Sequence, residues 1–341
     1  MKTQKRAFMR VIVFCKSLNF CNLQLKSTRN HYYHYFNIKY SMSTTQRKLV
    51  VYFVPVLVIL FLFSPDKFAK SFWDGLCIWA INVLPVLLPF GFLSTLWTSS
   101  INTSKFSFTQ KLFGINCDKI FISSLICGYP VGAQQIVENC TDKNQAERMF
   151  SFCSTSSPIF IIGTVGARFL QNTTAAIIVA TSQIIGCIIN GLAYKKIIPT
   201  GSKLLINTLP QSAKQQNIFD TLLNCILSVL SVGAIIALFV MLSEMLSSIF
   251  PSNITTSTPF GFILGLLETT NGIMLVSRSA TLLPATVLTS TLLSFGGLSV
   301  FIQSLSYVAK LKVNVARLLV MKITQCAFTT IISFILCIII L

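Results

Sequence analysis

Acidic residues and histidines are scarce in this 341-residue chain, which has nine Asp and Glu, two His and 27 Lys and Arg. No two carboxylates are plausibly paired for acid–base chemistry, and no set of His, Cys, Asp and Glu has the spacing of a metal site. The sequence also lacks a phosphate-binding loop and a Gly-x-Ser-x-Gly elbow. We therefore predict a protein that is not an enzyme and uses no cofactor; an integral membrane enzyme is the least favoured alternative.

Charged residues make up only 11% of the chain against 53% hydrophobic residues, and the mean hydropathy is +0.72. These values are typical of a protein that crosses a lipid bilayer several times. The net charge of +18 lies in short stretches between apolar runs and forms no basic patch interleaved with aromatics, so nucleic acid is not an expected partner. The eleven cysteines form no Cys-x-x-Cys pair, and most lie in apolar runs where Cys packs as a small hydrophobe.

The apolar runs predict an all-α polytopic membrane protein, because a helix needs roughly 20 apolar residues to cross a bilayer. Two further segments, 118–137 and 259–277, contain a turn near the middle and are interpreted as re-entrant hairpins. The fold class predicted is about seven transmembrane helices plus two re-entrant hairpins, arranged as an inverted repeat. The seven crossings are expected at 49–63, 76–97, 149–167, 174–194, 219–250, 282–309 and 318–341.

The distribution of Lys and Arg predicts the orientation, since these residues accumulate in short cytoplasmic loops. With the N-terminus inside, the inner segments carry 20 Lys and Arg and the outer segments carry four. We expect a cell-membrane protein with a cytoplasmic N-terminus and an external C-terminus. Each half contains three crossings and a hairpin that returns to its own side, so the second half enters from the opposite face. The expected organisation is a basic cytoplasmic tail at 1–48 with Met42 as an alternative start, an extra transmembrane helix at 49–65, repeat 1 at 66–196, a cytoplasmic linker at 197–216 and repeat 2 at 217–341.

The two repeats are offset by about 143 residues, and in each an apolar run is broken by polar and helix-breaking residues before a second interrupted segment follows. Broken apolar segments at matching positions of two halves indicate a transport-type binding site. The candidates in the first repeat are Gly128, Tyr129, Pro130, Gly132, Ser151, Ser154, Ser156, Ser157 and Pro158. The candidates in the second are Glu268, Thr269, Thr270, Asn271, Gly272, Ser294, Gly296, Gly297 and Gln303.

Irregular backbone inside a membrane is stable only where it is buried in protein or lines a watery cavity, because each unpaired group costs several kcal/mol. Pro130 and its neighbouring glycines therefore predict a cavity, and a structural turn packed against another helix is the alternative. Glu268 marks an ion, proton or substrate path by default. The alternative is that Glu268 lies near the membrane interface and forms an ion pair with Arg278. Near residue 142 we expect a capped helix start with a Lys143–Glu147 pair.

Several motifs resemble those of the YlbJ-type sporulation integral membrane proteins, which share a gate or nucleoside-recognition domain with nucleoside and ferrous-iron transporters. The resemblance covers about residues 50–341 and implies a multi-pass protein of spore-forming bacteria that is required for spore cortex formation. It implies transport without an assigned substrate, and positions 1–48 depart from the family. The matching segments are 84–90, 124–133 with its Gly-Tyr-Pro-x-Gly-Ala motif, 146–153, 157–166 and 294–300.

Two functions are compatible with these features. The first is a transporter or permease that moves an unidentified small solute or ion between the two hairpins, driven by a gradient, by diffusion or by a partner. The alternative is a non-transporting scaffold or subunit of a sporulation membrane complex. The lipid bilayer is the one partner that both require, and a homo-oligomer is compatible with either.

Overall fold

The computed structural model describes residues 44–100, 108–199 and 218–341, which fall into two compact units, 1–62 and 63–341. Most of the predicted tail, the alternative start at Met42 and most of the linker at 197–216 lie outside the described residues. The first unit is described only by α3 (Thr44–Phe63), which contains Pro55. Side chains of α3 are described only from Val54 onward, so the predicted crossing at 49–63 lies partly outside the residues described at that level. The described part, Val54–Phe63, is an apolar helix, and the crossing stays a prediction.

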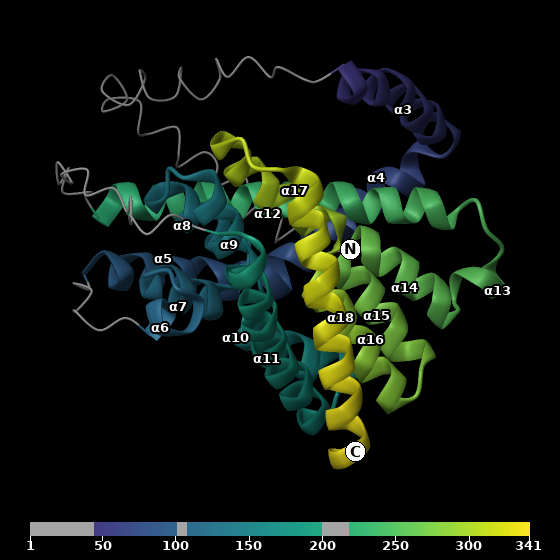
Figure 1. Cartoon of the computed structure of the whole chain (residues 1–341). Helices are drawn as coiled ribbons and strands as arrows, with labels where there is room; N and C mark the ends of the chain where they lie inside the picture. Colours follow the sequence, from purple (N-terminus) through teal and green to yellow (C-terminus); the bar gives the residue numbers. More distant parts are fainter. Residues whose placement is uncertain (1–43, 101–107, 200–217) are drawn as a thin grey trace. The chain divides into compact units, whose positions relative to one another are not determined.

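The second unit is helical throughout its described residues and contains no strand there (Figure 1). Five of its helices or interrupted helices are long and apolar enough to cross a membrane, and a sixth candidate is bent by 48° between Pro65–Val83 and Leu87–Leu93. The protein is thus a multi-pass membrane protein with five to six candidate spans in the described residues, each of which overlaps one of the seven predicted crossings. The five are Lys143–Leu170, Thr173–Ile197, Ile218–Ser247, Leu282–Leu311 and Val315–Ile340.

The elements of this unit occur twice in the same order: a long helix or bent helix, a short helix, two helices joined by a tight break, an interrupted helix and a long helix. In the first half these are α4 (Pro65–Ile78) with η2 (Trp79–Val83) and α5 (Leu84–Ser100), α6 (Phe108–Phe113), α7 (Asp118–Cys127) and α8 (Val131–Asn139), α9 (Lys143–Cys153) with α10 (Pro158–Phe160) and η3 (Ile161–Leu170), and α11 (Thr173–Ile197). In the second half they are α12 (Ile218–Ser247), α13 (Ser252–Thr255), α14 (Thr258–Leu267) and α15 (Thr269–Ser279), α16 (Leu282–Phe295) with α17 (Gly297–Val308) and η4 (Ala309–Leu311), and α18 (Val315–Ile340).

Matching helices of the two halves pack against each other and run in opposite directions. Near the start of α4, Lys67 Nζ lies 2.9 Å from Glu244 Oε1 near the end of α12, and Trp79 further along contacts Gly233. Likewise, α11 and α18 are antiparallel neighbours, visible with α16 as a side-by-side group in Figure 1. Gly186 of α11 lies against Thr329, and the amide of the later Asn190 donates to the carbonyl of the earlier Met321.

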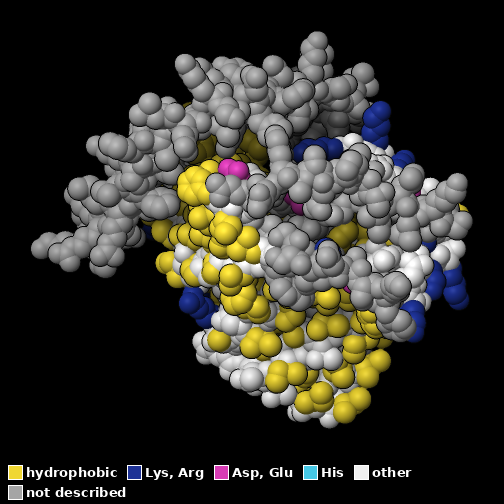
Figure 2. All heavy atoms as spheres, turned by 90° about the vertical axis from the view of Figure 1, so that its left-hand side faces the viewer, with side chains coloured by type: hydrophobic (Ala, Val, Ile, Leu, Met, Phe, Trp, Pro, Cys, Tyr) yellow, Lys and Arg dark blue, Asp and Glu magenta, His cyan; other side chains and the backbone are white. Residues whose placement is uncertain are grey.

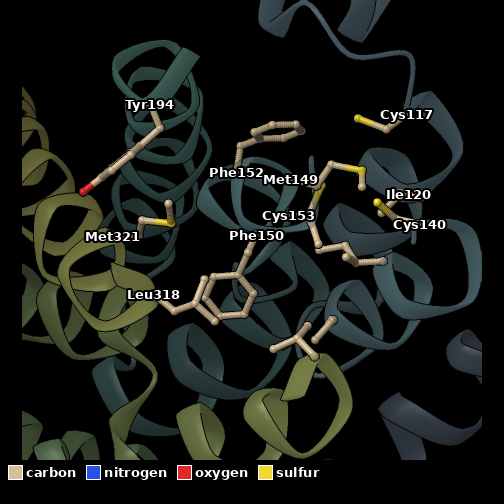
Figure 3. Close-up of a cluster of buried hydrophobic side chains, with 14 of the residues drawn as sticks. Cys117, Ile120, Cys140, Met149, Phe150, Phe152, Cys153, Tyr194, Leu318 and Met321 are labelled. Atoms are coloured by element: carbon tan, nitrogen blue, oxygen red, sulfur yellow. The ribbon is translucent and has the colours of Figure 1, made fainter. Parts of the chain in front are cut away.

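A buried apolar cluster holds the α7–α9 region against α11 and α18 (Figure 3). The rings of Phe113 and Phe152 stack with centroids 4.0 Å apart. Cys117, Cys140 and Cys153 belong to the same cluster as free thiols, packed as small hydrophobic side chains. Burial raises the pKa of the Cys140 thiol to about 11, so this thiol stays protonated at neutral pH.

The beginning of α9 is capped as expected, because the Asp142 carboxylate accepts a hydrogen bond from Gln145 N at 2.8 Å. The predicted Lys143–Glu147 pair is wrong. Glu147 is fully buried, its Oε2 accepts from Arg317 at 2.6 Å, and its Oε1 accepts from Asn314 N at 2.7 Å. The i,i+4 spacing along the helix suggested the pair. However, the face of α9 that carries Glu147 lies against the start of α18, where the buried carboxylate binds the Arg317 guanidinium.

The exposed surface of the second unit is strongly apolar. In Figure 2 the lowest part of the face shown carries hydrophobic and uncharged side chains, and the visible Lys and Arg lie higher or at the edges. Large side chains such as Leu238 of α12 and Ile338 of α18 are 46% and 62% exposed. Such surfaces match a lipid environment.

Candidate functional site

The predicted break at Gly128 is present, and α7 and α8 fold back on each other as hairpin 1 (118–139). Gly128 has a φ of 72°, and a Cβ there would lie 2.6 Å from Ser157 N. Only glycine tolerates this combination of conformation and close approach. Tyr129 N donates to Thr155 O at 3.0 Å, and Ser157 Oγ donates to Ile126 O at 2.7 Å. The tip of hairpin 1 is therefore bonded to the break between α9 and α10 in its own repeat.

Hairpin 2 (258–279) consists of α14 and α15, which meet at Glu268 and lie antiparallel. Their backbones nearly touch at Gly265 and Gly272, because a Cβ on Gly272 would be 2.1 Å from Gly265 Cα. The Glu268 carboxylate caps α15, accepting from Thr270 N at 3.0 Å and Asn271 N at 2.7 Å. Glu268 is 2% exposed, and the described residues contain no ion pair between it and Arg278. The interfacial pairing considered from the sequence is therefore wrong.

The break between α16 and α17 receives the tip of hairpin 2. Gly296 and Gly297 have φ values of 83° and 69°, and a Cβ on Gly297 would be 2.8 Å from Thr269 Oγ1 and 3.1 Å from Gly265 O. Hairpin 2 thus packs on the interrupted helix of its repeat as hairpin 1 does on its own. The sequence predicted both breaks, but it did not predict that each hairpin packs against one.

The tips of the two hairpins line a common cavity, which we call the tip cavity. The space open to the centre of a water molecule is about 60 Å³, several times the roughly 10–15 Å³ that one water needs. Thr269 and Gln303 are among its lining residues, and their buried Oγ1 and Nε2 atoms have no hydrogen-bond partner among the described residues. The lining residues are Val83, Leu87, Cys127, Gly128, Tyr129, Ser156, Ser157, Phe160, Val232, Ile236, Glu268, Thr269, Thr270, Leu293, Val300 and Gln303.

A second space, the side cavity, lies beside the first and shares Leu87 and Val232 with it. It is about 80 Å³ by the same measure and is bounded by α5, α8 and α12. Its lining is more polar than that of the tip cavity. The residues are Leu87, Gly91, Thr95, Pro130, Val131, Gln134, Glu138, Thr221, Asn224, Cys225, Ser228, Val229 and Val232.

The predicted site residues divide into those that line the tip cavity, one that lines the side cavity and those that line neither. Gly128, Tyr129, Ser156, Ser157, Glu268, Thr269, Thr270 and Gln303 line it. Pro130 lines the side cavity instead. Outside both linings are Gly132, Ser151, Ser154, Pro158, Asn271, Gly272, Ser294, Gly296 and Gly297. Several of these permit close packing: Gly132, for example, leaves room for Cys153 O, which a Cβ would approach to 2.0 Å.

Lys322 is a buried charged residue that the sequence interpretation missed. Its Nζ donates to Ser154 O at 2.8 Å and to Gln325 Oε1 at 3.1 Å, and it lies 5.8 Å from the centroid of the Tyr129 ring. Lys322 therefore donates to a backbone carbonyl that the end of α9 leaves without a helical partner, and the helix dipole favours a cation at this position. The available signal was that Lys322 is the one charged residue in the predicted span at 318–341.

Sequence comparison connects the chain to one named protein. It is 26% identical over 309 residues to the sporulation integral membrane protein YlbJ of Bacillus subtilis, covering 77% of this chain and 76% of the relative. The chain is a distant homologue of YlbJ. No protein-family model matches the chain, and no solved structure matches it. The homology agrees with the family resemblance and with the membrane-spanning helices, and the name of YlbJ specifies no solute.

Tyr129 connects hairpin 1 to the other repeat, because its hydroxyl donates to Leu293 O of α16 at 3.0 Å. We expect Tyr129→Phe to lower the unfolding free energy by about 1–2 kcal/mol, since a buried carbonyl loses its partner. Thermal unfolding in detergent measures the loss. An unchanged stability of Tyr129→Phe would show that this hydrogen bond contributes nothing.

Proposed function

We propose that this multi-pass membrane protein is a transporter or permease that moves a small polar solute or ion through the tip cavity. The observation that carries the proposal is that Gly128–Tyr129 and Glu268–Thr270, far apart in sequence, border the same space. Helix breaks and a buried carboxylate such as Glu268 are costly in a membrane, and a cavity shared by the two hairpin tips gives both a functional explanation. Discontinuous helices from two repeats that meet at one site are typical of secondary transporters.

The two repeats are proposed to be inverted in the membrane, with hairpins 1 and 2 re-entering from opposite faces. Support comes from the matching order of elements and from the antiparallel packing of α4 with α12 and of α11 with α18. The excess of Lys and Arg in the loops at 138–148 and 309–315 over those at 168–173 and 277–281 supports a cytoplasmic N-terminus and an external C-terminus.

A role in sporulation is proposed from the distant homology to a protein named for it. Together with the family resemblance, this supports transport connected with formation of the spore cortex. A scaffold would also fit the homology, but a scaffold gives no reason for a cavity that joins two hairpin tips.

A substitution that fills the tip cavity distinguishes a transporter from a scaffold. We expect Val300→Phe, which places a larger side chain in the lining, to slow solute uptake at least about tenfold, a loss equivalent to about 1.4 kcal/mol. The measurement is uptake by reconstituted vesicles, screened with nucleosides, cortex precursors and inorganic ions. In sporulating cells the same variant should accumulate normally and yield spores with lowered heat resistance.

Leu298→Phe is the matched control, because Leu298 lies on the same helix and is 37% exposed. It should leave uptake and spore resistance unchanged. If Val300→Phe also supported full sporulation, or if no solute of any kind entered the vesicles, the transport proposal would be overturned in favour of a scaffold.

A further inference from the structure

Lys322 is a buried lysine inside a candidate membrane span and has no ion-pair partner. It belongs to Val315–Ile340, it is 2% exposed, and no carboxylate of the described residues lies within ion-pair distance of its Nζ. The hydrogen bonds from Nζ go to Ser154 O and Gln325 Oε1, and an uncharged amide side chain can donate such bonds as well. Because a charged group in a membrane is costly and marks an ion or proton path by default, the lysine needs a functional explanation.

The contacts that favour the ammonium come mainly from the other half of the chain. Ser154 O, which accepts from Nζ at 2.8 Å, stands at the C-terminal end of α9, where the helix dipole is negative. The Tyr129 ring of hairpin 1 has its centroid 5.8 Å from Nζ, within the range of a cation–π interaction. Tyr129 also lines the tip cavity, so Lys322 is one ring away from the proposed solute site. Separation of the two halves would leave the ammonium with Gln325 of its own helix.

The described surroundings of Lys322 contain no acid that would fix its charge. The ionisable groups with which it interacts are Tyr129 of hairpin 1, Cys187 of α11 and Cys326 of α18. The neighbouring α16 has no ionisable side chain, and Glu147, the carboxylate of α9, is bonded near the start of α18 instead. An ammonium held by neutral oxygens and a ring can lose its proton when these contacts are withdrawn, whereas a carboxylate beside it would favour the charged form.

A stripe of buried polar side chains leads away from Lys322 along α18. Gln325, Thr329 and Ser333 lie on the same face of this helix and are fully buried. The hydroxyls of Thr329 and Ser333 are each bonded to a serine hydroxyl of α16, at 3.1 and 2.8 Å, and Gln325 Nε2 has no hydrogen-bond partner among the described residues. Hydroxyl groups both donate and accept hydrogen bonds. The stripe therefore gives a proton that leaves Lys322 polar surroundings within an apolar span.

We propose that transport is coupled to protons and that Lys322 is the residue that carries the coupling proton. This inference rests on the proposed transport function and deepens it, because it names the coupling ion. The ammonium forms while the two halves are in contact through Ser154 O and the Tyr129 ring. When the halves separate, one N–H bond of the ammonium breaks, the electron pair stays on Nζ, and the proton passes to water on the side that is then open. Protonation from the other side restores the contact and completes the cycle.

Three variants fix the charge of this group while keeping a hydrogen-bonding side chain at each position. Lys322→Arg is permanently positive, because a guanidinium does not lose its proton in proteins, and Lys322→Gln is permanently neutral. Gln325→Glu leaves Lys322 itself unaltered and introduces a carboxylate in place of the amide whose oxygen lies 3.1 Å from Nζ, so the ammonium gains an ion-pair partner that retains its proton.

The test uses the full chain in lipid vesicles with each solute of the uptake screen. With the unaltered chain, a more acidic outside should speed uptake at least about fivefold, the lower end of the usual coupling between two ligands. All three variants should lose this stimulation but still exchange labelled solute at equal pH faster than empty vesicles, because exchange moves no net proton. Lys196→Arg and Lys196→Gln, at the exposed end of α11, are the matched controls and should keep the stimulation.

The proton is followed directly with a pH-sensitive dye enclosed in the vesicles. Solute added outside should acidify the interior at least about fivefold faster with the unaltered chain than with any of the three variants. A purely structural Lys322 predicts instead that every variant that folds keeps both the stimulation and the acidification. That result, or uptake by the unaltered chain without either signal, would overturn proton coupling through Lys322 and leave transport standing. Uptake of no solute at all would overturn both.

Discussion

Gly272→Ala will prevent hairpin 2 from closing and will destabilise the protein by about 3 kcal/mol or more, at the upper end of the range for overpacking. The added Cβ would be 2.1 Å from Gly265 Cα and 2.3 Å from Gly265 N. Both contacts are with backbone, so no rotamer change relieves them, and α14 and α15 must separate. Thermal unfolding in detergent and the yield of folded protein measure the effect.

Gly163→Ala is the matched control, because a Cβ at Gly163 meets nothing within 4 Å. The same substitution there should leave the unfolding free energy unchanged or raise it by up to about 1 kcal/mol, because alanine is favoured over glycine inside a helix. Equal stability of the two variants would show that the two helices do not pack backbone to backbone. This outcome would also remove the support that positions Glu268 in the tip cavity.

Glu268→Gln will reduce uptake at least about 30-fold, which corresponds to about 2 kcal/mol, because it removes the one carboxyl group among the described lining residues of the tip cavity. The side chain keeps its size, and its remaining amide oxygen still accepts one of the two N–H groups that the carboxylate holds. The stability should therefore fall by only about 1 kcal/mol. Initial uptake rates, normalised to the amount of folded protein in the vesicles, measure the effect.

Glu244→Gln removes the same charge from α12 at a place outside both cavities, where Glu244 pairs with the exposed Lys67. It should transport at the rate of the unaltered chain. Full uptake by Glu268→Gln, or equal losses in the two variants, would show that Glu268 is not the binding carboxylate.

The breaks could be predicted from sequence because they depend on local chemistry. Pro130 cannot continue a helix, Gly128 permits a left-handed φ, and a carboxylate such as Glu268 is conspicuous in an apolar run. The packing of each hairpin against an interrupted helix could not be predicted. It depends on close backbone contacts between residues that are more than 20 positions apart in the sequence, such as Gly128 and Ser157. Lys322 was missed for a related reason: its partner is the carbonyl of Ser154, and a sequence does not show carbonyls freed by a break elsewhere.

Hydropathy predicts the spans because it depends only on composition, and each candidate span in the described residues overlaps a predicted crossing. The crossing at 49–63 stays a prediction, since side chains of α3 are described only from Val54 onward. The predicted site residues fall into two groups. Thr269 and Gln303 border the cavity, while Ser151 and Ser294 are buried in helix contacts, with Ser151 Oγ donating to Arg148 O and Ser294 Oγ bonded to Thr329 Oγ1.

Each hairpin tip is attached to a partner from its own half of the chain: Tyr129 N to Thr155 O in one, and Thr269 beside Gly297 in the other. A tip and its companion helix can consequently travel together as one rigid body. If the halves rock about the α11–α18 contact, the seam between them can open toward alternate sides while both hairpins stay folded. A transport cycle of this kind would require the Tyr129–Leu293 hydrogen bond to break at each turnover, together with others that join the halves, such as Lys322 Nζ–Ser154 O.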